Sequence, residues 1–448
     1  MLEIKEYKRG NEIYYELISY EKGFENIISK VYFRSVIQEV NGKYWLNLYT
    51  SNMVPVSEAF EFLNYTSAHQ SINTRTKSMQ ALKFLYSFCE IIGKNISAFT
   101  PTDINNLKLF LKGISFSGKE ISMGLLTHRS NRTINGYLAI FRNYLHAIGV
   151  KNEALTQTYR EGVNKIYDSD PNLRYRSNES TPMQSIEVPR YISPDEFSAI
   201  LNIIRKKYSR QEECIVRLMY QHGFRLGEVL GLTNDDLVEE IINDGWVTVA
   251  YIRNRASDKP YQKAKSCINV IDKKQYRTKD YQEYGFQKVI LDQGLYELLN
   301  EYICEAHNSE AKDFPENFAK SSIADRVRKN EPFEEKNRYI FISCYGRPLR
   351  SDSWNRKLRR IFEEAGIEID TGVRKHNLNH RFRHGFAMYQ VKHMGRNELE
   401  LMYLMRHSSL KSVEVYFKPT LKDQLELKQA FEESLMTSIP NLMRKEDK

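Results

Sequence analysis

A segment without apolar periodicity divides the chain into two parts. Residues 169–189 carry three prolines and several serines and asparagines, a composition typical of an exposed linker. Directly after it, Ser193-Pro194-Asp195-Glu196 predicts a helix start, because serine and glutamate can form a capping box and proline fits the first turn. A chain of 448 residues can hold two or three domains, so we expect folded units on both sides of this linker.

The first 62 residues are predicted to be rich in strands. Val36–Val40 and Lys43–Tyr49 flank Asn41-Gly42, and this dipeptide supplies the positive φ angles of a type I′ hairpin turn. We therefore interpret residues 1–62 as a β-rich N-terminal segment. It is either a small extra module that contacts a partner or an appendage packed on the next domain.

Residues 63–168 have the periodicity of helices instead. Thr100-Pro101-Thr102-Asp103 supplies the cap, the proline and the acidic residue of one helix start. Two apolar stripes recur at helical spacing, namely Ala81, Leu85, Phe88 and Ile92, and Ile134, Leu138, Phe141, Leu145 and Ile148. We expect a small helical bundle here, then the linker, then a last domain of residues 190–448.

Charge points to a polyanionic partner. The net charge is +9, and no apolar run is long enough to span a bilayer, which favours nucleic acid over a membrane surface. A merely basic protein is the alternative. Basic residues between the predicted helices suit contacts with a DNA backbone, unless they only face solvent; they are Lys112, Lys119, His128, Arg129 and Arg132. The segment of residues 1–62 is a second candidate for DNA contact.

The cysteines and the N-terminus favour a cytoplasmic protein. The five cysteines are scattered and form no Cys-x-x-Cys pair, so we expect reduced thiols and neither a disulfide framework nor a zinc site. Residues 1–7 contain no apolar signal core.

The first candidate for chemistry follows Gly223. Arg225 stands at a predicted helix start, where the backbone also favours anions. Glu228, one turn later, can hold the guanidinium in place. An ordinary Arg–Glu pair on a helix is the alternative interpretation.

A long basic segment lies between two predicted strands, Trp246–Ile252 and Gln287–Leu291. Such a hairpin tip can place one ammonium group in a groove of DNA, although most of its lysines are expected to be plain surface residues. The basic residues are Lys259, Lys263, Lys265, Lys273, Lys274, Arg277 and Lys279.

A second polar cluster is predicted on a helix. His380 and Arg383 are three residues apart, so a helix points both the same way, as suits a phosphate or another oxyanion. His376, His380 and His384 also follow at intervals of four. No glutamate follows the first of them in the His-Glu-x-x-His manner, and no cysteine is near, so zinc is not favoured.

The third cluster lies near the C-terminus. Residues 401–420 predict the end of one helix, a tight Ser-Ser turn and a short second helix carrying Tyr416, with His407 nine residues before it. A buried tyrosine after a turn is the alternative. Because the two earlier clusters also suit a phosphate, we interpret Tyr416 as a nucleophile that attacks DNA phosphate.

The order Arg, Lys, His-x-x-Arg, His, Tyr resembles the tyrosine recombinase (phage integrase) family, of the mobile-element integrase or transposase type. The motifs are Phe224–Leu232, His380–Ala387 and Leu404–Tyr416, and the resemblance covers roughly residues 190–420. It implies a multidomain, mainly α fold. Its parts would be a helical core-binding (SAM-like) DNA domain and a mixed α+β catalytic domain with a small antiparallel sheet, and the β-containing N-terminal segment predicted above from its residues would precede them.

Two positions and one segment depart from the family's pattern. Arg406 replaces the usual glycine before the histidine, and Phe382 replaces leucine in the His-x-x-Arg motif. The segment between the two strands is much longer than usual, so the family's catalytic lysine is ambiguous. We choose Lys265, with Lys279 as the alternative.

The resemblance implies phosphoryl transfer to tyrosine. Tyr416 would attack phosphorus, form a 3′-phosphotyrosyl link and release a 5′-hydroxyl. Arg225, supported by Glu228, and Arg383 would clamp the non-bridging oxygens of the scissile phosphate.

The other motif residues would handle protons and position the phosphate. Lys265 would protonate the leaving oxygen, His380 would act as general acid–base near Tyr416, and His407 would hydrogen-bond a phosphate oxygen. One phosphodiester is exchanged for another, so the chemistry needs no cofactor, metal or ATP.

The expected partners are double-stranded DNA at specific recombination sites, further copies of the chain in a homo-tetramer on paired DNA, and accessory DNA-bending proteins, with no membrane involved. A C-terminal apolar stripe could dock on a neighbouring copy or pack on its own chain; it is Leu427, Ala430, Phe431 and Leu435. The expected location is cytoplasmic and nucleoid-associated.

Two other functions remain open at this point. One is relaxation of DNA by a type IB topoisomerase-like enzyme, and the other is a DNA-binding regulator on a recombinase scaffold. Within the recombinase interpretation, the extra N-terminal segment and the long insertion favour integration and excision of a mobile element over resolution of chromosome dimers. The target DNA sequence, the direction of reaction and the accessory factors do not follow from the sequence.

Overall fold

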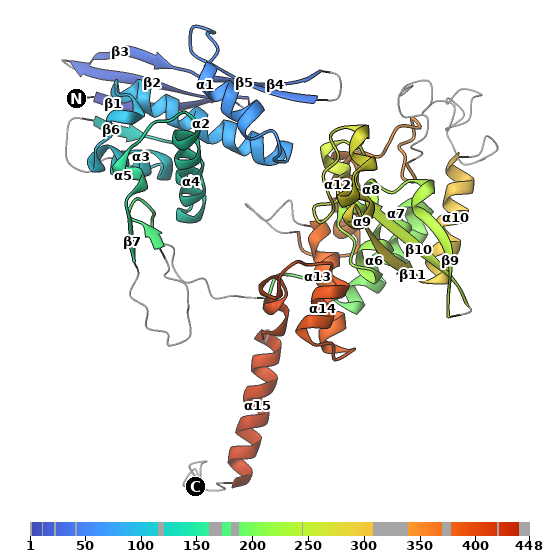
Figure 1. The fold of residues 1–448 in the computed structure, drawn as a ribbon. Coiled ribbons are helices and arrows are strands. Elements are labelled where there is room, and N and C mark those ends of the chain that lie inside the picture. The colour runs from blue at the N-terminus through green and yellow to red at the C-terminus, as the bar shows by residue number, and fades with distance from the viewer. Residues whose placement is uncertain are drawn as a thin grey trace, which may run out of the picture. The chain divides into compact units, whose positions relative to one another are not determined.

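The computed structural model describes residues 2–10, 12–21, 24–40, 43–114, 121–160, 173–180, 188–243, 245–307, 339–369, 378–418 and 421–438. The chain forms two compact units, Met1–Gln184 and Ser185–Lys448 (Figure 1). No helix of the described residues is both long and apolar enough to cross a membrane.

The first unit combines two small sheets with helices. One sheet has the strand order β3-β2-β1-β6, in which β1, β2 and β3 are antiparallel and β6 is parallel to β1. Its strands are β1 (Leu2–Arg9), β2 (Glu12–Glu21), β3 (Phe24–Val31) and β6 (Ile121–Gly124). The other sheet pairs β4 (Arg34–Val40) with β5 (Lys43–Tyr49), and Val40 lies opposite Lys43. This register confirms the predicted hairpin, whose turn residues Asn41 and Gly42 lie outside the described residues.

The helices of the first unit include the one whose start the sequence predicts at Thr100, and the two apolar stripes lie on α2 and α4. Thr100 caps its helix by accepting from the Asp103 N–H, and the Asp103 carboxylate accepts from the Thr100 N–H at 2.9 Å. The helices are α1 (Ser57–Glu61), η1 (Phe62–Thr66), α2 (Ile72–Ile92), η2 (Ile96–Ala98), α3 (Pro101–Lys112), α4 (Asn131–Ala147) and α5 (Glu153–Thr156).

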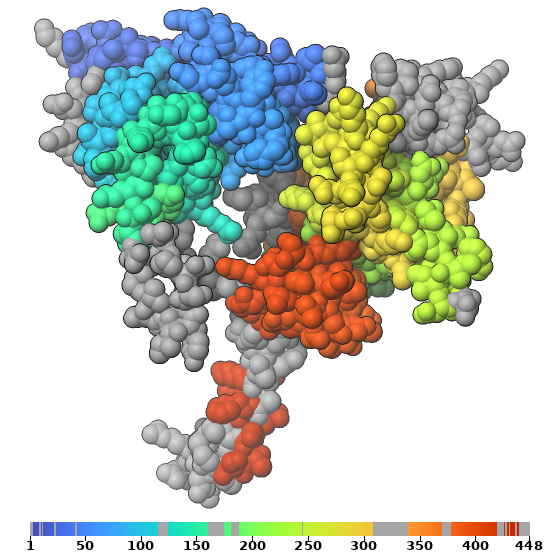
Figure 2. Space-filling view, in the orientation of Figure 1, coloured from blue at the N-terminus to red at the C-terminus, as the bar shows by residue number. Residues whose placement is uncertain are grey.

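Strands and helices of the first unit share one hydrophobic core. The rings of Tyr15 on β2 and Phe110 on α3 lie 5.0 Å apart. Buried polar groups link the same elements, since Asn64 accepts from the Leu46 N–H at 2.9 Å and from Arg75 at 2.7 Å. Figure 2 shows these strands and helices, coloured blue to teal, as one close-packed body. The β-rich segment of residues 1–62 therefore packs with the helical segment that follows it.

Part of the predicted linker also belongs to this unit. β7 (Thr158–Arg160) pairs with β8 (Leu173–Tyr175). Glu179 then forms ion pairs with Lys108 at 3.0 Å and Lys112 at 2.5 Å. Residues 173–180 thus pack on α3 and α4 through polar contacts, which the absence of apolar periodicity cannot reveal.

The second unit opens with the predicted capping box. The Ser193 N–H donates to the Glu196 carboxylate at 2.8 Å, and α6 (Pro194–Lys207) follows. Its three-stranded antiparallel sheet has the order β11-β10-β9, with β9 (Leu237–Ile242), β10 (Gly245–Arg253) and β11 (Phe286–Leu291). The pairing of β10 with β11 confirms the two strands predicted around the long basic segment.

Helices make up most of the rest of this unit. They are α7 (Arg210–Gln221), α8 (Leu226–Leu230), η3 (Asn234–Asp236), η4 (Pro260–Gln262), η5 (Lys273–Arg277), α9 (Lys279–Tyr284), α10 (Gln293–His307), α12 (Ser351–Glu364), α13 (Leu378–Lys392), α14 (Glu398–Leu404), η8 (Leu410–Ser412), η9 (Glu414–Phe417) and α15 (Leu421–Ser438). The predominance of helix, with a small antiparallel sheet in the second unit, confirms the predicted fold class.

Candidate active site

Arg225 and Glu228 form the ion pair predicted from their spacing. Arg225 is the residue before α8, and its Nη1 lies 2.6 Å from Glu228 Oε1. The other carboxylate oxygen accepts from the Arg225 N–H at 2.9 Å. The Glu228 side chain is fully buried, so its two oxygens hold both the backbone and the guanidinium of Arg225.

The long segment between β10 and β11 packs directly on α8. A Cβ atom on Gly231 would stand 2.3 Å from the carbonyl oxygen of Gln262, and one on Gly227 would stand 2.6 Å from that of Lys263. Only glycine allows this approach without a shift of backbone. It brings the residues after Lys263 to the Arg225 guanidinium, where Ser266 Oγ lies 3.5 Å from Arg225 Nη1.

Of the two lysines predicted as alternatives, Lys265 precedes Ser266, whose Oγ lies near the Arg225 guanidinium. Lys265 is exposed, and its charge contributes, after burial, to lowering the pKa of His380. Lys279 is the first residue of α9 and is also exposed. The side chain of Lys263 contacts another residue of the same segment, because its Nζ donates to Asn269 Oδ1 at 2.6 Å.

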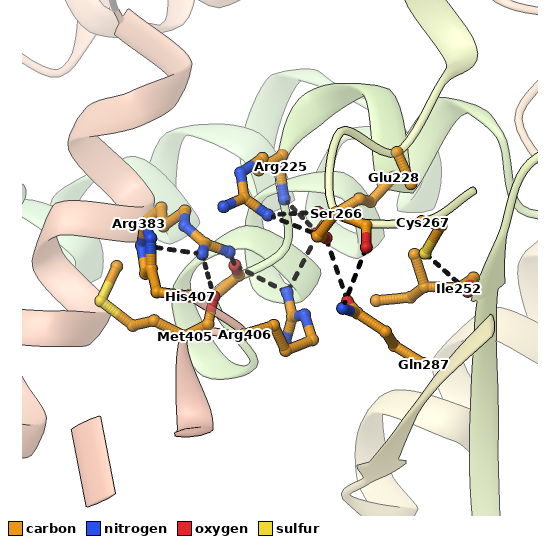
Figure 3. Close-up of polar contacts among 12 residues, drawn as sticks. Arg225, Glu228, Ile252, Ser266, Cys267, Gln287, Arg383, Met405, Arg406 and His407 are labelled. Carbon is orange, nitrogen blue, oxygen red and sulfur yellow. Dashed lines mark hydrogen bonds and ion pairs between the residues drawn. The ribbon is translucent and has the colours of Figure 1, made fainter. Parts of the chain in front are cut away.

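Arg383 joins three parts of the unit. It lies on α13, is buried, and donates to the carbonyl oxygen of Gly223 after α7. It also donates to the carbonyl oxygen of Met405 after α14 (Figure 3). Its Nη2 also lies 3.3 Å from His407 Nε2. Burial, followed by the charge of Arg383, lowers the pKa of His407 to about 4. A neutral His407 can therefore accept a hydrogen bond from Arg383.

Tyr416 is buried with its hydroxyl against a histidine. Only 4% of the residue is exposed, and it packs in an apolar cluster with Phe386, Leu401 and Val413. Burial raises the pKa of the Tyr416 hydroxyl to about 12, although Arg383 and Arg225 oppose the change.

The partner of the Tyr416 hydroxyl is His384, a residue for which the sequence motifs predict no role in the reaction. His384 Nδ1 lies 2.7 Å from the hydroxyl oxygen. The ring of His380 lies 6.2 Å from that of His384. Burial and the positive charges around it lower the pKa of His384 to about 3, so the neutral ring can accept the hydroxyl hydrogen. The signal in the sequence is its position directly after Arg383 and one turn after His380.

A pocket of about 180 Å³ lies among the predicted phosphate-binding groups. Asn379 accepts from Trp354 Nε1 at 2.6 Å and donates to Asn355 at 2.7 Å, so both amides are held in place. The lining residues are Phe224, Arg225, Leu226, Asn355, Asn379, His380 and Arg383. Two guanidiniums, an imidazole and two amides around one small pocket suit an anion.

Metal ligands are not gathered in the part of the chain that the structure describes. There, no group of three His, Cys, Asp or Glu residues could hold a metal ion. His376, the first of the three histidines spaced by four, lies outside the described residues.

The comparisons with known proteins identify the family. A search of curated proteins returned no match. Among solved structures, the chain is similar to a Tn1549 transposon integrase in complex with transposon right end DNA, with 16% identity, a TM-score of 0.46, and coverage of 83% of this chain and 98% of that one. It is also similar to an XerH site-specific recombinase bound to palindromic difH substrate, with 13% identity, a TM-score of 0.47, and coverage of 81% and 80%. The family model of the phage integrases matches residues 190–422, more than half of the 448-residue chain, and the protein therefore belongs to the phage integrase family, the tyrosine recombinases.

Proposed function

We propose that the protein cleaves and rejoins DNA strands at specific sites through a 3′-phosphotyrosyl intermediate, and that it integrates and excises a mobile element. One observation carries the proposal. Arg225 and Arg383 line one small pocket together with His380, and the charges of the two arginines act on the Tyr416 hydroxyl. An anion clamp and a tyrosine nucleophile in one cluster suit phosphoryl transfer to tyrosine.

The two arginines would bind the scissile phosphate. Their planar guanidiniums can each donate two hydrogen bonds to non-bridging oxygens, and they stay charged at any physiological pH. The negative charge on these oxygens grows as phosphorus becomes pentacoordinate. Donors held in place beforehand, as Arg225 is by Glu228, stabilise that state more than the ground state.

Tyr416 would be the nucleophile. A phenol is a weak nucleophile at neutral pH, and burial raises the pKa of Tyr416 further, to about 12. A bound phosphate brings negative charge, which disfavours ionisation of the phenol further. The hydroxyl must therefore lose its proton as it attacks and not before. His384 Nδ1 lies at hydrogen-bond distance from this hydroxyl, and with its proton on Nε2 it would accept the hydroxyl hydrogen. His380, on the pocket wall, is the general acid–base that the family resemblance implies.

Lys265 and His407 would complete the exchange. The ammonium of Lys265 would protonate the 5′ oxygen as it leaves, and His407 would hydrogen-bond a phosphate oxygen next to Arg383. A 5′-hydroxyl of a second strand then attacks the phosphotyrosine and reverses the chemistry. Each step exchanges one ester for another, which requires neither ATP nor a cofactor.

Strand exchange between two duplexes would require a homo-tetramer on paired DNA, with accessory DNA-bending proteins as further partners. α15 carries exposed Leu425 and Phe431, and Phe431 belongs to the stripe proposed to dock on a neighbouring copy. The extra N-terminal segment and the long insertion before β11 favour a mobile element over a housekeeping substrate.

Covalent trapping tests the proposal. The substrates are nicked duplexes from the junctions of the element that carries the gene, with a chelator present. The nick lets the short cleaved strand diffuse away, so the covalent complex accumulates as a slow band on a denaturing gel. We expect this band with the natural chain and not with Tyr416→Phe, which keeps the ring and lacks the hydroxyl.

The other outcomes separate the alternatives. Binding to the same DNA without a covalent band in the natural chain would indicate a regulator on a recombinase scaffold. Relaxation of supercoiled plasmids that lack the junction sequence would indicate a topoisomerase-like activity.

A further inference from the structure

Arg406 has a backbone conformation that favours glycine. Its φ is +53°, and Met53 and Asn243 are the other non-glycine residues with positive φ in the described part of the chain. A Cβ atom makes this left-handed region unfavourable for arginine. A residue kept in a disfavoured conformation beside a cluster of polar groups points to a role for its side chain.

The side chain of Arg406 reaches back to the segment before α8. Only 8% of it is exposed. Its Nη1 donates to the His222 carbonyl at 3.2 Å, and its Nη2 donates to the Gly223 carbonyl at 3.0 Å. The same Nη2 lies 3.0 Å from Glu228 Oε2 (Figure 3). Arg406 is therefore a second cationic partner of the carboxylate that holds Arg225.

The shared carboxylate changes the charge of the cluster. With an uncharged residue at position 406, Arg225 and Glu228 alone would form a neutral pair. With Arg406, two guanidiniums share one buried carboxylate, and the group has one net positive charge. Burial alone would raise the pKa of Glu228, but the charges of Arg406, Arg383 and Arg225 hold it below its usual value. Glu228 thus stays ionised and its negative charge is divided between two partners.

We propose that Arg406 is a positioning residue of the phosphate site: through Glu228 it fixes Arg225 and leaves more of the Arg225 charge available to the scissile phosphate. This inference rests on the proposed function. Among the described residues, the pocket is lined by Arg225 and Arg383 and not by Arg406, so Arg406 acts through Glu228 and not on DNA itself.

Three substitutions at this position test the role. Arg406→Gly and Arg406→Asn remove the charge and suit the left-handed backbone, since glycine and asparagine adopt it readily. Arg406→Lys keeps the charge and loses the fork that reaches two carbonyls and Glu228 together. Circular dichroism and thermal melting check that each variant is folded.

DNA affinity and cleavage rate should separate in these variants. We expect the affinity for junction DNA and its dependence on salt to remain unchanged, because no phosphate contact is lost. The single-turnover rate of covalent adduct formation should fall on the order of 10- to 100-fold in Arg406→Gly and Arg406→Asn, as for loss of charge stabilisation in a transition state. Arg406→Lys should recover part of the rate.

Coupling to Glu228 distinguishes this role from a general effect on packing. In a Glu228→Gln background, Arg406→Asn should change the rate far less than it does in the natural chain, because the link to Arg225 is already absent. Equal effects in both backgrounds would overturn the inference.

The remaining outcomes are also decisive. If the natural chain forms the adduct and the folded Gly and Asn variants form it at the same rate, the inference fails and the proposed function stands. If the natural chain forms no adduct, both fail. If neither variant folds, Arg406 serves the fold and not the phosphate site, which overturns the inference as well.

Discussion

The hydroxyl of Tyr416 lies 2.7 Å from Nδ1 of His384, the residue that follows Arg383 on α13. Three neighbouring positions on one helix face thus serve two features of the site. Arg383 and His380 line the pocket, and His384 contacts Tyr416, the proposed nucleophile. The ring of His384 is neutral because its pKa is lowered to about 3, so its Nδ1 can act as an acceptor when the proton lies on Nε2.

Loss of this acceptor should slow attack without weakening DNA binding. We expect His384→Phe to reduce the rate of adduct formation by roughly 100-fold or more, the usual effect of losing a group that assists proton transfer. His380→Phe in parallel shows whether both histidines contribute. If His384→Phe forms the adduct at the rate of the natural chain, His384 contacts Tyr416 but takes no part in the reaction.

Acid should begin to destabilise the second unit at a higher pH than titration of its carboxylates alone predicts. Burial first, then nearby positive charges, lower the folded-state pKa of His384 to about 3 and of His407 to about 4. Imidazoles in the unfolded chain titrate near pH 6.5. Between about pH 6.5 and 4 the unfolded chain therefore binds more protons than the folded chain, and the free energy of unfolding decreases as the pH is lowered. Each group contributes at most about 1.4 kcal/mol per pH unit.

Urea unfolding followed by circular dichroism between pH 7.5 and 5 measures this slope. His384→Phe lacks one of the two groups and should show a shallower dependence on pH. An unchanged slope would mean that His384 has an ordinary pKa in the folded chain.

The close approach of the basic segment to α8 should be sensitive to a single methyl group. In Gly231→Ala the new Cβ would meet the Gln262 carbonyl at 2.3 Å, so the backbone that leads to Lys265 must shift. We expect a loss of roughly 1–3 kcal/mol in stability and at least a tenfold lower cleavage rate, by analogy with other misplaced catalytic groups.

Gly245→Ala is the matched control. Its Cβ would find its nearest neighbour, the Ile242 carbonyl oxygen, at 3.6 Å, which is ordinary contact. Rates of adduct formation that fall equally in both variants would show that the effect is not specific to the segment beside Arg225.

The choice between the two lysines can be tested through the leaving group. Lys265→Ala should slow cleavage of an ordinary substrate by about 100-fold or more, as for loss of a general acid. In a substrate with sulfur in place of the 5′ bridging oxygen, the leaving group is a thiolate that needs no protonation. This substrate should therefore restore the cleavage rate of Lys265→Ala. Lys279→Ala should cleave both substrates as the natural chain does, and the opposite pattern would assign the role to Lys279.

Local signals in the sequence gave good predictions of local structure. The Asn41-Gly42 hairpin and the Ser193–Glu196 capping box depend on residues within a few positions of each other, and the structure confirms both. The composition of residues 169–189 predicts a linker because composition reflects apolar content, whereas residues 173–180 within it are held by ion pairs such as those of Glu179.

The contacts of the site are harder to predict because they join distant segments. His384 and Tyr416 are 32 positions apart, and no spacing rule relates them. Arg406 was noticeable as a departure from the family's glycine, but its contact with Glu228 spans 178 positions. The lysine was ambiguous for a similar reason, since the approach of its segment to α8 depends on two glycines in another part of the chain.

The shared core of the first unit has a consequence for exchanging parts between relatives. Tyr15 on β2 packs against Phe110 on α3, and Asn64 joins β5 to α2 through Leu46 and Arg75. A cut near residue 62 would expose both sides of this core. A chimera that borrows the N-terminal strands of another integrase must therefore also borrow α2 to α4, so that the strands and helices of this unit are exchanged as one block.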